Sequence, residues 1–389
     1  MSRYKWKKIW NLFQAYLDLL LARDKPKSLP VELSVGTTSF CNLKCVMCPR
    51  EGSDGNLTPF DEHINLDYFK SLEKYLEQSR EVSLYGLGEP MIDKRYFEKV
   101  RYVNSFGGEV SLSSNGTLLD EQRCREVIES GIAAIGISVD ATCEETFRIV
   151  RPPGGFDPIA ENIKRLTTMK KEMGADKPLV KVSFGIMKQN LQDVPNFPAF
   201  VKEVGGDEIV MHPTIYQSYQ AVEDLGLDRN EMLAAVEEAR KNAEALGVVF
   251  HFWDLNSMTF LNSVDYYRDN RDMIEDVRAQ ENQSNGEAED YSPPQNPKYY
   301  CHFLWRNAMV QGKGEVFPCC YMSNIKLGKF ENGNLNELRS HPILTKMRRD
   351  LYEGNPPGPC QSCPQMLPYD RTQILKDGYH EIKHMIKHS

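Results

Sequence analysis

Short apolar segments alternate with helix-patterned segments between residue 31 and about residue 245, and this alternation limits the possible folds more than any other feature. The expected strands are VELSVG (31–36), EVSLYG (81–86), EVSLSSNG (109–116), AIGISVDA (134–141), VKVSFGIM (180–187) and EIVMHPTI (208–215). The expected helices lie near 64–78, 93–105, 120–130, 157–172, 191–203 and 229–246. Six strand-then-helix units predict an α/β fold with a parallel sheet covered by helices.

Polar motifs follow several of these strands directly. They are Phe40–Pro49, Gly86–Pro90, Ser114–Gly116 and Ser138–Ala141. Functional residues of parallel sheets gather at the carboxyl ends of the strands. We therefore expect these four segments to form one site.

Composition excludes several classes of protein. The formal net charge of −8 over 389 residues argues against nucleic acid as the main partner. No run approaches the ~18 apolar residues of a membrane-spanning helix, and the start, MSRYKWKKIW, lacks the features of a secretory signal. We expect a cytoplasmic protein.

The use of cysteine also fits a reducing compartment. Eight of the ten cysteines fall in tight clusters, and ligand-like spacing favours metal binding over disulfides. Cys124 and Cys143 stand alone, and we expect both to be packed apolar residues.

The N-terminal segment 3–22 is patterned as a helix with one apolar stripe. The stripe contains Trp6, Ile9, Trp10, Phe13, Leu17 and Leu20. Residues 1–30 carry seven Lys or Arg against two Asp. We expect the stripe to pack on the main domain; the alternative is peripheral contact with a membrane surface.

The loop after the first strand, FCNLKCVMCP, has the spacing C-x3-C-x2-C. Its cysteines are Cys41, Cys45 and Cys48, and no other Cys or His occurs between residues 30 and 62. A structural zinc site or a closed iron–sulfur cluster needs a fourth ligand. Three thiolates on an open site indicate that a small molecule completes the coordination.

This motif resembles that of the radical S-adenosylmethionine (SAM) superfamily. The resemblance implies a partial (β/α)6 TIM-like barrel and a 4Fe–4S cluster on Cys41, Cys45 and Cys48. It also implies that SAM chelates the fourth iron and is cleaved reductively to a 5′-deoxyadenosyl radical, which abstracts hydrogen from a substrate.

Further segments resemble SAM-binding motifs of the same superfamily. LYGLGEP (84–90) resembles its Gly-Gly-Glu-Pro segment, although Leu87 interrupts the paired glycines. The contacts implied are Met47 with the adenine, Gly86, Gly88 and Glu89 with the ammonium, Ser114 and Asn115 near the ribose, and Ser138 and Arg151 with the carboxylate. The alternative is ordinary turn chemistry, most of all for Asn115, Ser138 and Arg151.

The C-terminal region contains a second cysteine set. Cys301, twelve residues, Gly314, four residues and Cys319 resemble the start of a SPASM/twitch extension, which implies a small α+β domain. With the pair Cys360 and Cys363 these cysteines would hold one auxiliary 4Fe–4S cluster, with zinc as the alternative. Cys320 is expected to be either a packed thiol or a hydrogen-atom donor to the substrate radical.

These patterns divide the chain into four segments. They are an amphipathic basic helix and linker at 1–30, a radical SAM core at 31–245, a connecting segment at 246–298, and an auxiliary-cluster domain with a basic tail at 299–389.

The resemblance implies a radical SAM oxidoreductase or epimerase with an external one-electron donor such as flavodoxin or ferredoxin. We expect a small-molecule substrate (a carbohydrate, cyclitol or lipid-linked group), because only about 30 residues precede the core, which weakens the peptide alternative. That alternative is a peptide-modifying maturase. A different class would be a non-catalytic iron–sulfur electron-transfer or scaffold protein.

Overall fold

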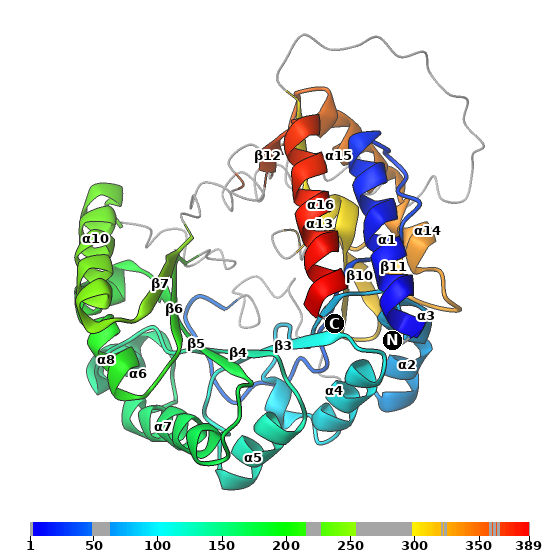
Figure 1. Cartoon of the computed structure of the whole chain (residues 1–389). Coiled ribbons are helices and arrows are strands. Elements are labelled where there is room, and N and C mark those ends of the chain that lie inside the picture. Colours follow the sequence, from blue (N-terminus) through cyan, green and yellow to red (C-terminus); the bar gives the residue numbers. More distant parts are fainter. Residues whose placement is uncertain are drawn as a thin grey trace. The chain divides into compact units, whose positions relative to one another are not determined.

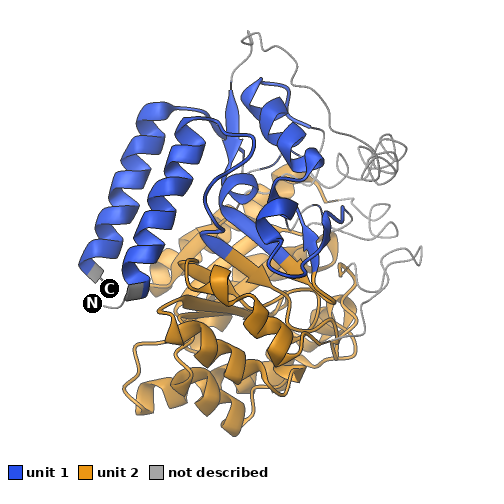
Figure 2. Cartoon of the chain, turned by 90° about the vertical axis from the view of Figure 1, so that its right-hand side faces the viewer, with its two compact units in different colours: residues 1–32, 256–309, 315–389 blue, residues 33–255, 310–314 orange. Residues whose placement is uncertain are grey.

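The computed structural model describes residues 3–48, 63–214, 227–253, 298–319, 322, 325–357, 360, 363 and 366–388. The chain forms two compact units, which Figure 2 distinguishes by colour. Unit 1 contains residues 1–32, 256–309 and 315–389, and unit 2 contains residues 33–255 and 310–314. The boundaries of the four segments expected from the sequence stay predictions.

Unit 2 is built on a parallel sheet with the spatial order β1-β2-β3-β4-β5-β6-β7. Its strands are β1 (Glu32–Val35), β2 (Glu81–Ser83), β3 (Glu109–Ser114), β4 (Ala134–Ser138), β5 (Leu179–Ile186), β6 (Glu208–Pro213) and β7 (Val249–Phe252). All pairs from β2 to β7 are parallel. The six expected strands and the α/β class are confirmed, and β7 is a further strand that the sequence patterns did not predict.

Helices of unit 2 follow the strands in alternation. They are α2 (Leu66–Ser71), α3 (Glu73–Leu76), the 3₁₀ helix η2 (Pro90–Ile92), α4 (Tyr96–Ser105), α5 (Glu121–Glu129), α6 (Glu144–Val150), α7 (Phe156–Glu172), the 3₁₀ helix η3 (Lys188–Asn196), α8 (Phe197–Glu203) and α10 (Arg229–Leu246). Figure 1 shows α4, α5, α7 and α8 along the outer side of strands β3 to β6.

Local sequence explains where several of these helices begin and end. Asp120 caps α5 by accepting a hydrogen bond from the amide of Arg123. Asp228 caps α10 in the same way, and α10 ends at Gly247 with φ +65°. The expected helix at 64–78 is divided into α2 and α3 at Leu72, and the helix at 191–203 is divided into η3 and α8. Helix α6 was not predicted.

The core of unit 2 follows the side-chain periods of its elements. In β5 the residues Val180, Val182, Phe184 and Ile186 are at most 1% exposed, with half-buried residues between most of them. Burying each such side chain contributes about 1.5–3 kcal/mol. This packing holds the strands in a register that pairs Ser138 of β4 with Ser183 of β5. The carboxyl ends of the strands therefore lie at one edge of the sheet.

Unit 1 is a small α+β assembly. Its elements are α1 (Arg3–Leu20), β8 (Tyr299–Cys301), α13 (His302–Arg306), β9 (Asn307–Gln311, whose last two residues belong to unit 2), β10 (Glu315–Phe317), β11 (Gly328–Lys329), α14 (Leu335–Arg339), α15 (Pro342–Tyr352), β12 (Met366–Pro368) and α16 (Arg371–His388). Strand β10 pairs with β11 and β8 pairs with β12, both antiparallel. None of the described helices is long and apolar enough to cross a membrane.

The orientation of α1 differs from expectation. Its buried face is formed by Leu12, Ala15, Tyr16 and Leu19, which are at most 6% exposed. Of the expected stripe only Ile9 is fully buried, whereas its aromatic members point to solvent. The prediction that the stripe packs inward is therefore wrong, because the helix has a second apolar face that takes the buried position.

Candidate functional site

The three cysteines of the first motif lie in the loop after β1, and each is half-buried. The amide of Lys44 donates to the carbonyl of Pro152 (2.6 Å), and the amide of Val46 donates to that of Val150 (3.1 Å). These two bonds fix the cysteine loop against the segment that follows α6. The motifs at 40–49 and 148–155 therefore lie together.

The glycines of LYGLGEP allow a close approach of two backbones. A Cβ at Gly88 would lie 2.4 Å from the carbonyl oxygen of Thr38 and 2.7 Å from that of Phe40. A Cβ at Gly86 would lie 2.9 Å from the Cα of Gly36. The amide of Glu89 donates to the same Phe40 carbonyl at 2.7 Å. Only glycine fits here, which gives Gly86 and Gly88 a packing role whether or not they contact a ligand.

Glu89 is 2% exposed and accepts three hydrogen bonds at the edge of the sheet. Its Oε1 accepts from Ser114 Oγ (2.9 Å) and from the amide of Met91 (3.1 Å), and its Oε2 accepts from the amide of Asn115 (2.7 Å). Burial raises the pKa of this carboxyl, and the three hydrogen bonds and the charge of Arg151 only partly counteract that rise. A cation beside Glu89 would stabilise its ionised form.

Asn115 connects the end of β3 to the cysteine loop. Its Nδ2 donates to Cys41 Sγ at 3.7 Å and to Asn42 Oδ1 at 2.9 Å. Ser114 instead faces Glu89, so its position in this structure is that of a support for the carboxylate. The amide of Leu43 also donates to Cys41 Sγ, at 3.5 Å. Two N–H groups are thus directed at one cysteine sulfur.

Arg151 is directed at a second cysteine sulfur, and the residue that orients it was not anticipated. The guanidinium donates through Nη1 to Cys45 Sγ at 3.6 Å, and it binds Asp140 Oδ2 through both Nε (2.7 Å) and Nη2. Asp140 has φ +60°, an uncommon value for a residue other than glycine. Its Oδ1 accepts from the amide of Gly185 (2.6 Å), and its carbonyl accepts from Asn190 Nδ2 (2.9 Å).

The charges at this position influence one another. Burial acts to lower the pKa of Arg151, but the charges of Asp140 and Cys45 outweigh burial and raise it. Burial raises the pKa of the Cys45 thiol to about 11, with Arg151 opposing the rise. Arg151 is therefore a permanent cation beside a cysteine sulfur. The sequence signal for Asp140 was its place in ISVDA, directly after a strand.

Two other expected residues lie apart from this network. Ser138 Oγ accepts from Ser183 Oγ at 3.2 Å, a link between neighbouring strands. Met47 is partly buried and packs against Val150 and Met187. The roles of Ser138 at the carboxylate and of Met47 at the adenine stay predictions.

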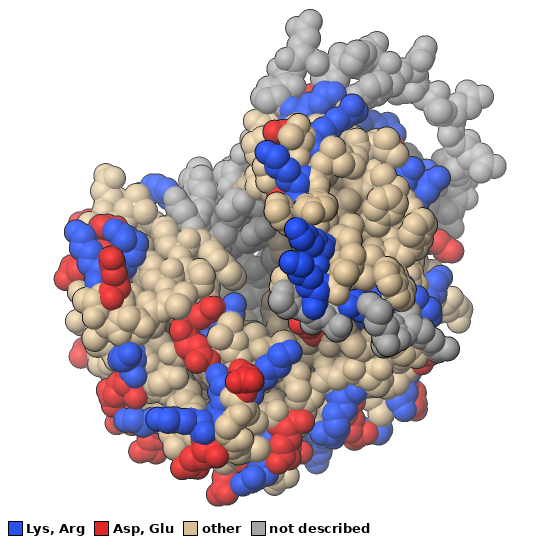
Figure 3. Space-filling view, viewed as in Figure 1, with Lys and Arg blue, Asp and Glu red and all other residues tan. Residues whose placement is uncertain are grey.

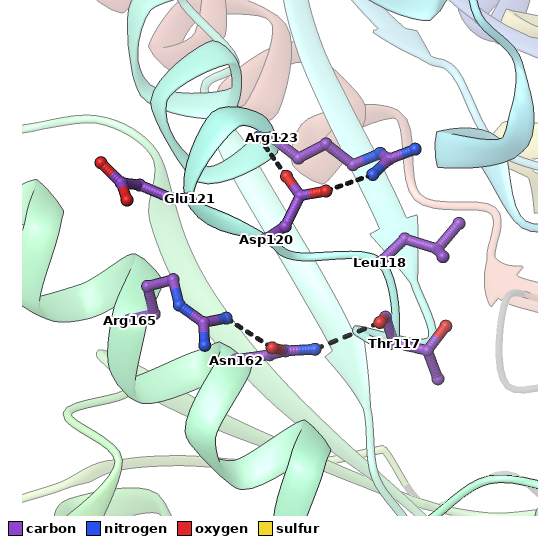
Figure 4. A pocket seen from close by; sticks show the side chains of 7 residues that line it. All are labelled: Thr117, Leu118, Asp120, Glu121, Arg123, Asn162 and Arg165. Atoms are coloured by element: carbon purple, nitrogen blue, oxygen red, sulfur yellow. Dashed lines mark hydrogen bonds and ion pairs between the residues drawn. The ribbon is translucent and has the colours of Figure 1, made fainter.

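A pocket of about 460 Å³ lies behind the loop that follows β3. Figure 4 shows Asn162 bridging from Arg165 to the backbone at Thr117, with Arg123 and Asp120 paired on the other side. Asn162 Nδ2 also donates to the carbonyl of Gly116. Through these bonds Asn162 stabilises the loop that carries Asn115, whereas Glu121 in Figure 4 bonds to none of the residues drawn.

The second cysteine set lies in unit 1. Cys301, Cys319 and Cys360 are at most 8% exposed, and Cys363 is half-buried. The amide of Cys363 donates to the carbonyl of Cys360 (3.1 Å), and burial, followed by the charges of Cys301 and Cys363, raises the pKa of Cys360. The pairing of Met366 with Cys301 brings the segment that follows Cys363 back to β8. Cys320 lies outside the described residues.

Both sets consist of cysteines, the residue type that holds the irons of iron–sulfur clusters. Cluster irons are held by cysteine thiolates, and N–H donors directed at the sulfurs stabilise the negative charge of the assembly. Cys41 and Cys45 have such donors in Asn115 and Arg151. No three His, Cys, Asp or Glu side chains converge on a single metal ion within the described ranges. The individual ligand assignments stay predictions.

Comparison with known protein families indicates which kinds of iron–sulfur cluster the two cysteine sets bind. Residues 35–196 match the radical SAM superfamily, and residues 301–364 match the SPASM iron–sulfur cluster-binding domain. The chain carries a radical SAM domain followed by a SPASM domain. The first implies SAM and a 4Fe–4S cluster, and the second implies auxiliary iron–sulfur clusters.

Curated proteins related to this radical SAM–SPASM chain match it over about half of its residues. The tungsten-containing aldehyde ferredoxin oxidoreductase cofactor-modifying protein of Pyrococcus furiosus is 28% identical over 209 residues, which is 53% of this chain and 58% of that protein. The Fe-coproporphyrin III synthase of Methanosarcina barkeri is 27% identical over 210 residues, or 52% and 50%. The chain thus spans 50–58% of the length of these two relatives.

Solved structures show the same fold. SuiB of Streptococcus suis bound to S-adenosylmethionine superposes with a TM-score of 0.56 at 14% identity, over 82% of this chain and 66% of SuiB. The likeness supports a mixed α/β fold with a parallel-strand sheet.

Proposed function

We propose that this radical SAM–SPASM protein cleaves SAM reductively to a 5′-deoxyadenosyl radical and abstracts hydrogen from a small-molecule substrate, giving oxidation or epimerisation. One observation supports the proposal most directly. Three separate motifs, at Glu89, Asn115 and Arg151, are hydrogen-bonded to the cysteine loop or to one another at the carboxyl edge of the sheet.

Each of these residues has a distinct task in the proposed site. Glu89 is a buried carboxylate that can accept the ammonium of an amino acid, whose charge offsets the cost of ionising it. Asn115 and Arg151 donate N–H groups to the sulfurs of Cys41 and Cys45, which stabilises charge on a bound cluster. Asp140 holds the guanidinium in place.

Bound at this site, a 4Fe–4S cluster and SAM would supply the one-electron reduction of a sulfonium and a carbon radical that abstracts hydrogen. In the proposed SPASM site Cys301, Cys319, Cys360 and Cys363 would hold one auxiliary 4Fe–4S cluster, which would accept an electron from the substrate in a net oxidation. An external one-electron carrier such as a flavodoxin or ferredoxin would supply the electron that reduces the SAM-binding cluster. The electron taken up by the auxiliary cluster would pass back to that carrier or to the SAM-binding cluster. Cys320 is retained as a proposed hydrogen donor for an epimerase.

The substrate class is proposed from the relatives that match in sequence. One is named for modifying a cofactor and another for synthesising Fe-coproporphyrin III, both small molecules. A peptide substrate is the second candidate, because the fold resembles SuiB, which has been solved bound to its precursor peptide SuiA. These relatives support only the small-molecule class; within it we propose a carbohydrate, cyclitol or lipid-linked group.

The experiment has two stages. Reconstituted, dithionite-reduced protein is incubated with SAM, and 5′-deoxyadenosine is measured by chromatography. We expect product from the wild type and from Cys143→Ala, a cysteine outside both motifs, and none from Cys45→Ala. Intact clusters without 5′-deoxyadenosine would favour the non-catalytic electron-transfer class.

The second stage separates the substrate classes. Small-molecule and protein fractions of a cell extract are added separately, and the yield of 5′-deoxyadenosine is compared with the yield without additions. Stimulation by the small-molecule fraction is the expected result. Stimulation by the protein fraction alone would replace the proposal with the peptide-modifying one.

A further inference from the structure

The outward side of α1 carries a stripe of large apolar side chains. Trp6, Trp10 and Phe13 are 53%, 65% and 41% exposed, and their spacing places them on one side of the helix. Leu17 and Leu20 continue the stripe and are half-buried. Scattered exposed hydrophobic residues are ordinary, but a continuous stripe indicates an interaction surface.

Hydrogen bonds on the opposite side of α1 fix this orientation. Asn11 Nδ2 donates to the carbonyl of Leu29 (3.1 Å), and its Oδ1 accepts from the Leu29 amide (2.8 Å). Asp18, which is fully buried, accepts from the amide of Ser28 and from Arg23, both at 2.8 Å. Turning the stripe inward would expose these partners and break the bonds, so the aromatic side chains are held outward.

Helix α16 lies antiparallel beside α1 and extends the surface. Lys5 Nζ donates to the carbonyl of Ile386 (3.0 Å), and Tyr16 donates to Glu381 (2.6 Å). A Cβ at Gly378 would lie 2.9 Å from the Tyr16 ring, so this glycine lets the two helices approach closely.

The exposed apolar residues of α16 lie on the same side of the helix pair as the stripe of α1. Leu375, Tyr379 and Ile386 are 57%, 60% and 46% exposed. At about 100° per residue, the stripe of α1 lies about a quarter turn from Tyr16, the side that contacts α16, and the exposed residues of α16 lie about a quarter turn from Gly378, the side that contacts α1. Because the two helices are antiparallel, both stripes then face the same side of the pair. We call this surface the aromatic face; it consists of Trp6, Trp10, Phe13, Leu375, Tyr379 and Ile386. Figure 3, viewed as in Figure 1, shows a largely uncharged surface over α1 with Lys and Arg beside it over α16.

The charge of the two helices is opposite in sign to that of the chain. Helix α1 has four Lys or Arg and one acidic residue, and α16 has four and two, whereas the chain as a whole has a net charge of −8. Asp18 and Glu381 are paired toward the interior with Arg23 and Arg306. Lys5 and Lys8 of α1 are buried as well. The positive charge beside the aromatic face therefore comes mainly from the exposed lysines of α16, which are Lys376, Lys383 and Lys387.

We propose that the aromatic face docks on the surface of an anionic lipid bilayer. Tryptophan and tyrosine side chains favour the level of the lipid headgroups, and flanking lysines attract anionic lipids. A second copy of this chain fits less well, because two basic faces would repel each other. This inference is independent of the radical chemistry, since it concerns how the protein reaches a surface.

The test uses the full-length, cluster-reconstituted protein and sedimentation with two kinds of vesicle. One kind is phosphatidylcholine alone, and the other is phosphatidylcholine mixed with phosphatidylglycerol. We expect cosedimentation with the mixed vesicles that weakens as salt is raised. The double variant Trp6→Ala/Trp10→Ala should lower the partition coefficient at least about tenfold. Trp253→Ala removes a tryptophan that is 55% exposed elsewhere, and it should have no effect.

Two further measurements keep the result unambiguous. Replacing Lys376 and Lys383 by Glu should abolish the preference for anionic vesicles, and unchanged cluster absorbance will show that each variant is folded. Brominated lipids should quench tryptophan fluorescence in the wild type and quench it much less in the double variant. Equal sedimentation of the wild type and the Trp6/Trp10 variant would overturn the proposal. The proposal would also be overturned if the protein did not bind vesicles and instead formed a dimer that is lost in the Trp6/Trp10 variant.

Discussion

Replacing Asp140 by Ala tests whether the unanticipated Asp140–Arg151 pair organises the candidate site. The substitution removes both bonds to the guanidinium and the acceptor for the Gly185 amide, and it leaves a cation whose side chain is 11% exposed. Removing one partner of a buried pair typically costs about 3–5 kcal/mol. Alanine at φ +60° adds backbone strain in the same direction.

The thermal midpoint of the apoprotein measures this cost. A unit of 150–250 residues loses roughly 2–4 °C per kcal/mol, so Asp140→Ala should lower the midpoint of unit 2 by about 6–20 °C. Asp140→Asn keeps an acceptor and tolerates the positive φ, so it should show a smaller loss. The exposed pair Lys164–Glu203 is the control, and Glu203→Ala should cost about 0–1 kcal/mol. If Asp140→Ala melts within the range of that control, the pair does not organise the site.

The remaining predictions concern one residue each. Because burial raises the pKa of Glu89, the affinity for SAM should fall as the pH drops through that raised pKa. Calorimetry should show that protons are released when SAM binds. If Glu89→Gln had the same pH profile as the wild type, the assignment of Glu89 would be contradicted. Gly314→Ala should lower the thermal midpoint more than Gly174→Ala. Both glycines have positive φ, but only a Cβ at Gly314 would clash with the Tyr68 hydroxyl. Equal losses of thermal midpoint would show that Tyr68 moves away from the added Cβ. Cys360→Ser should lower bound iron from about eight to about four per chain while SAM cleavage with dithionite persists, and unchanged iron would show that Cys360 is no ligand.

Local periodicity in the sequence was sufficient to predict most strands and helices of unit 2. A strand exposes alternate residues to each side, and a helix repeats every 3.6 residues, so each segment carries its own pattern. Strand β5 was expected at 180–187 and lies at Leu179–Ile186. Strand β7 was missed although its sequence VFHF is mostly apolar, because it is only four residues long and lies at the edge of the sheet.

The sequence predicted which residues belong to the candidate site, but it did not predict which of them form hydrogen bonds with one another. Arg151 was expected at a ligand carboxylate, yet the structure gives it Asp140, a carboxylate eleven residues away that the end of β4 brings within reach. Ser114 was expected near the ribose and instead supports Glu89. Which polar groups pair is decided by the distances between chain segments, and sequence spacing alone does not contain those distances.

By itself the sequence determined the alternating α/β framework and the spacing of both cysteine sets, because backbone geometry and ligand geometry are local. Only the tertiary structure decided which side of α1 is buried. That helix has two apolar faces, and Asn11 and Asp18 select one of them by binding the chain at Ser28 and Leu29. Buried polar groups must keep their partners, so these few hydrogen bonds outweigh the preference of Trp6 and Trp10 for the interior.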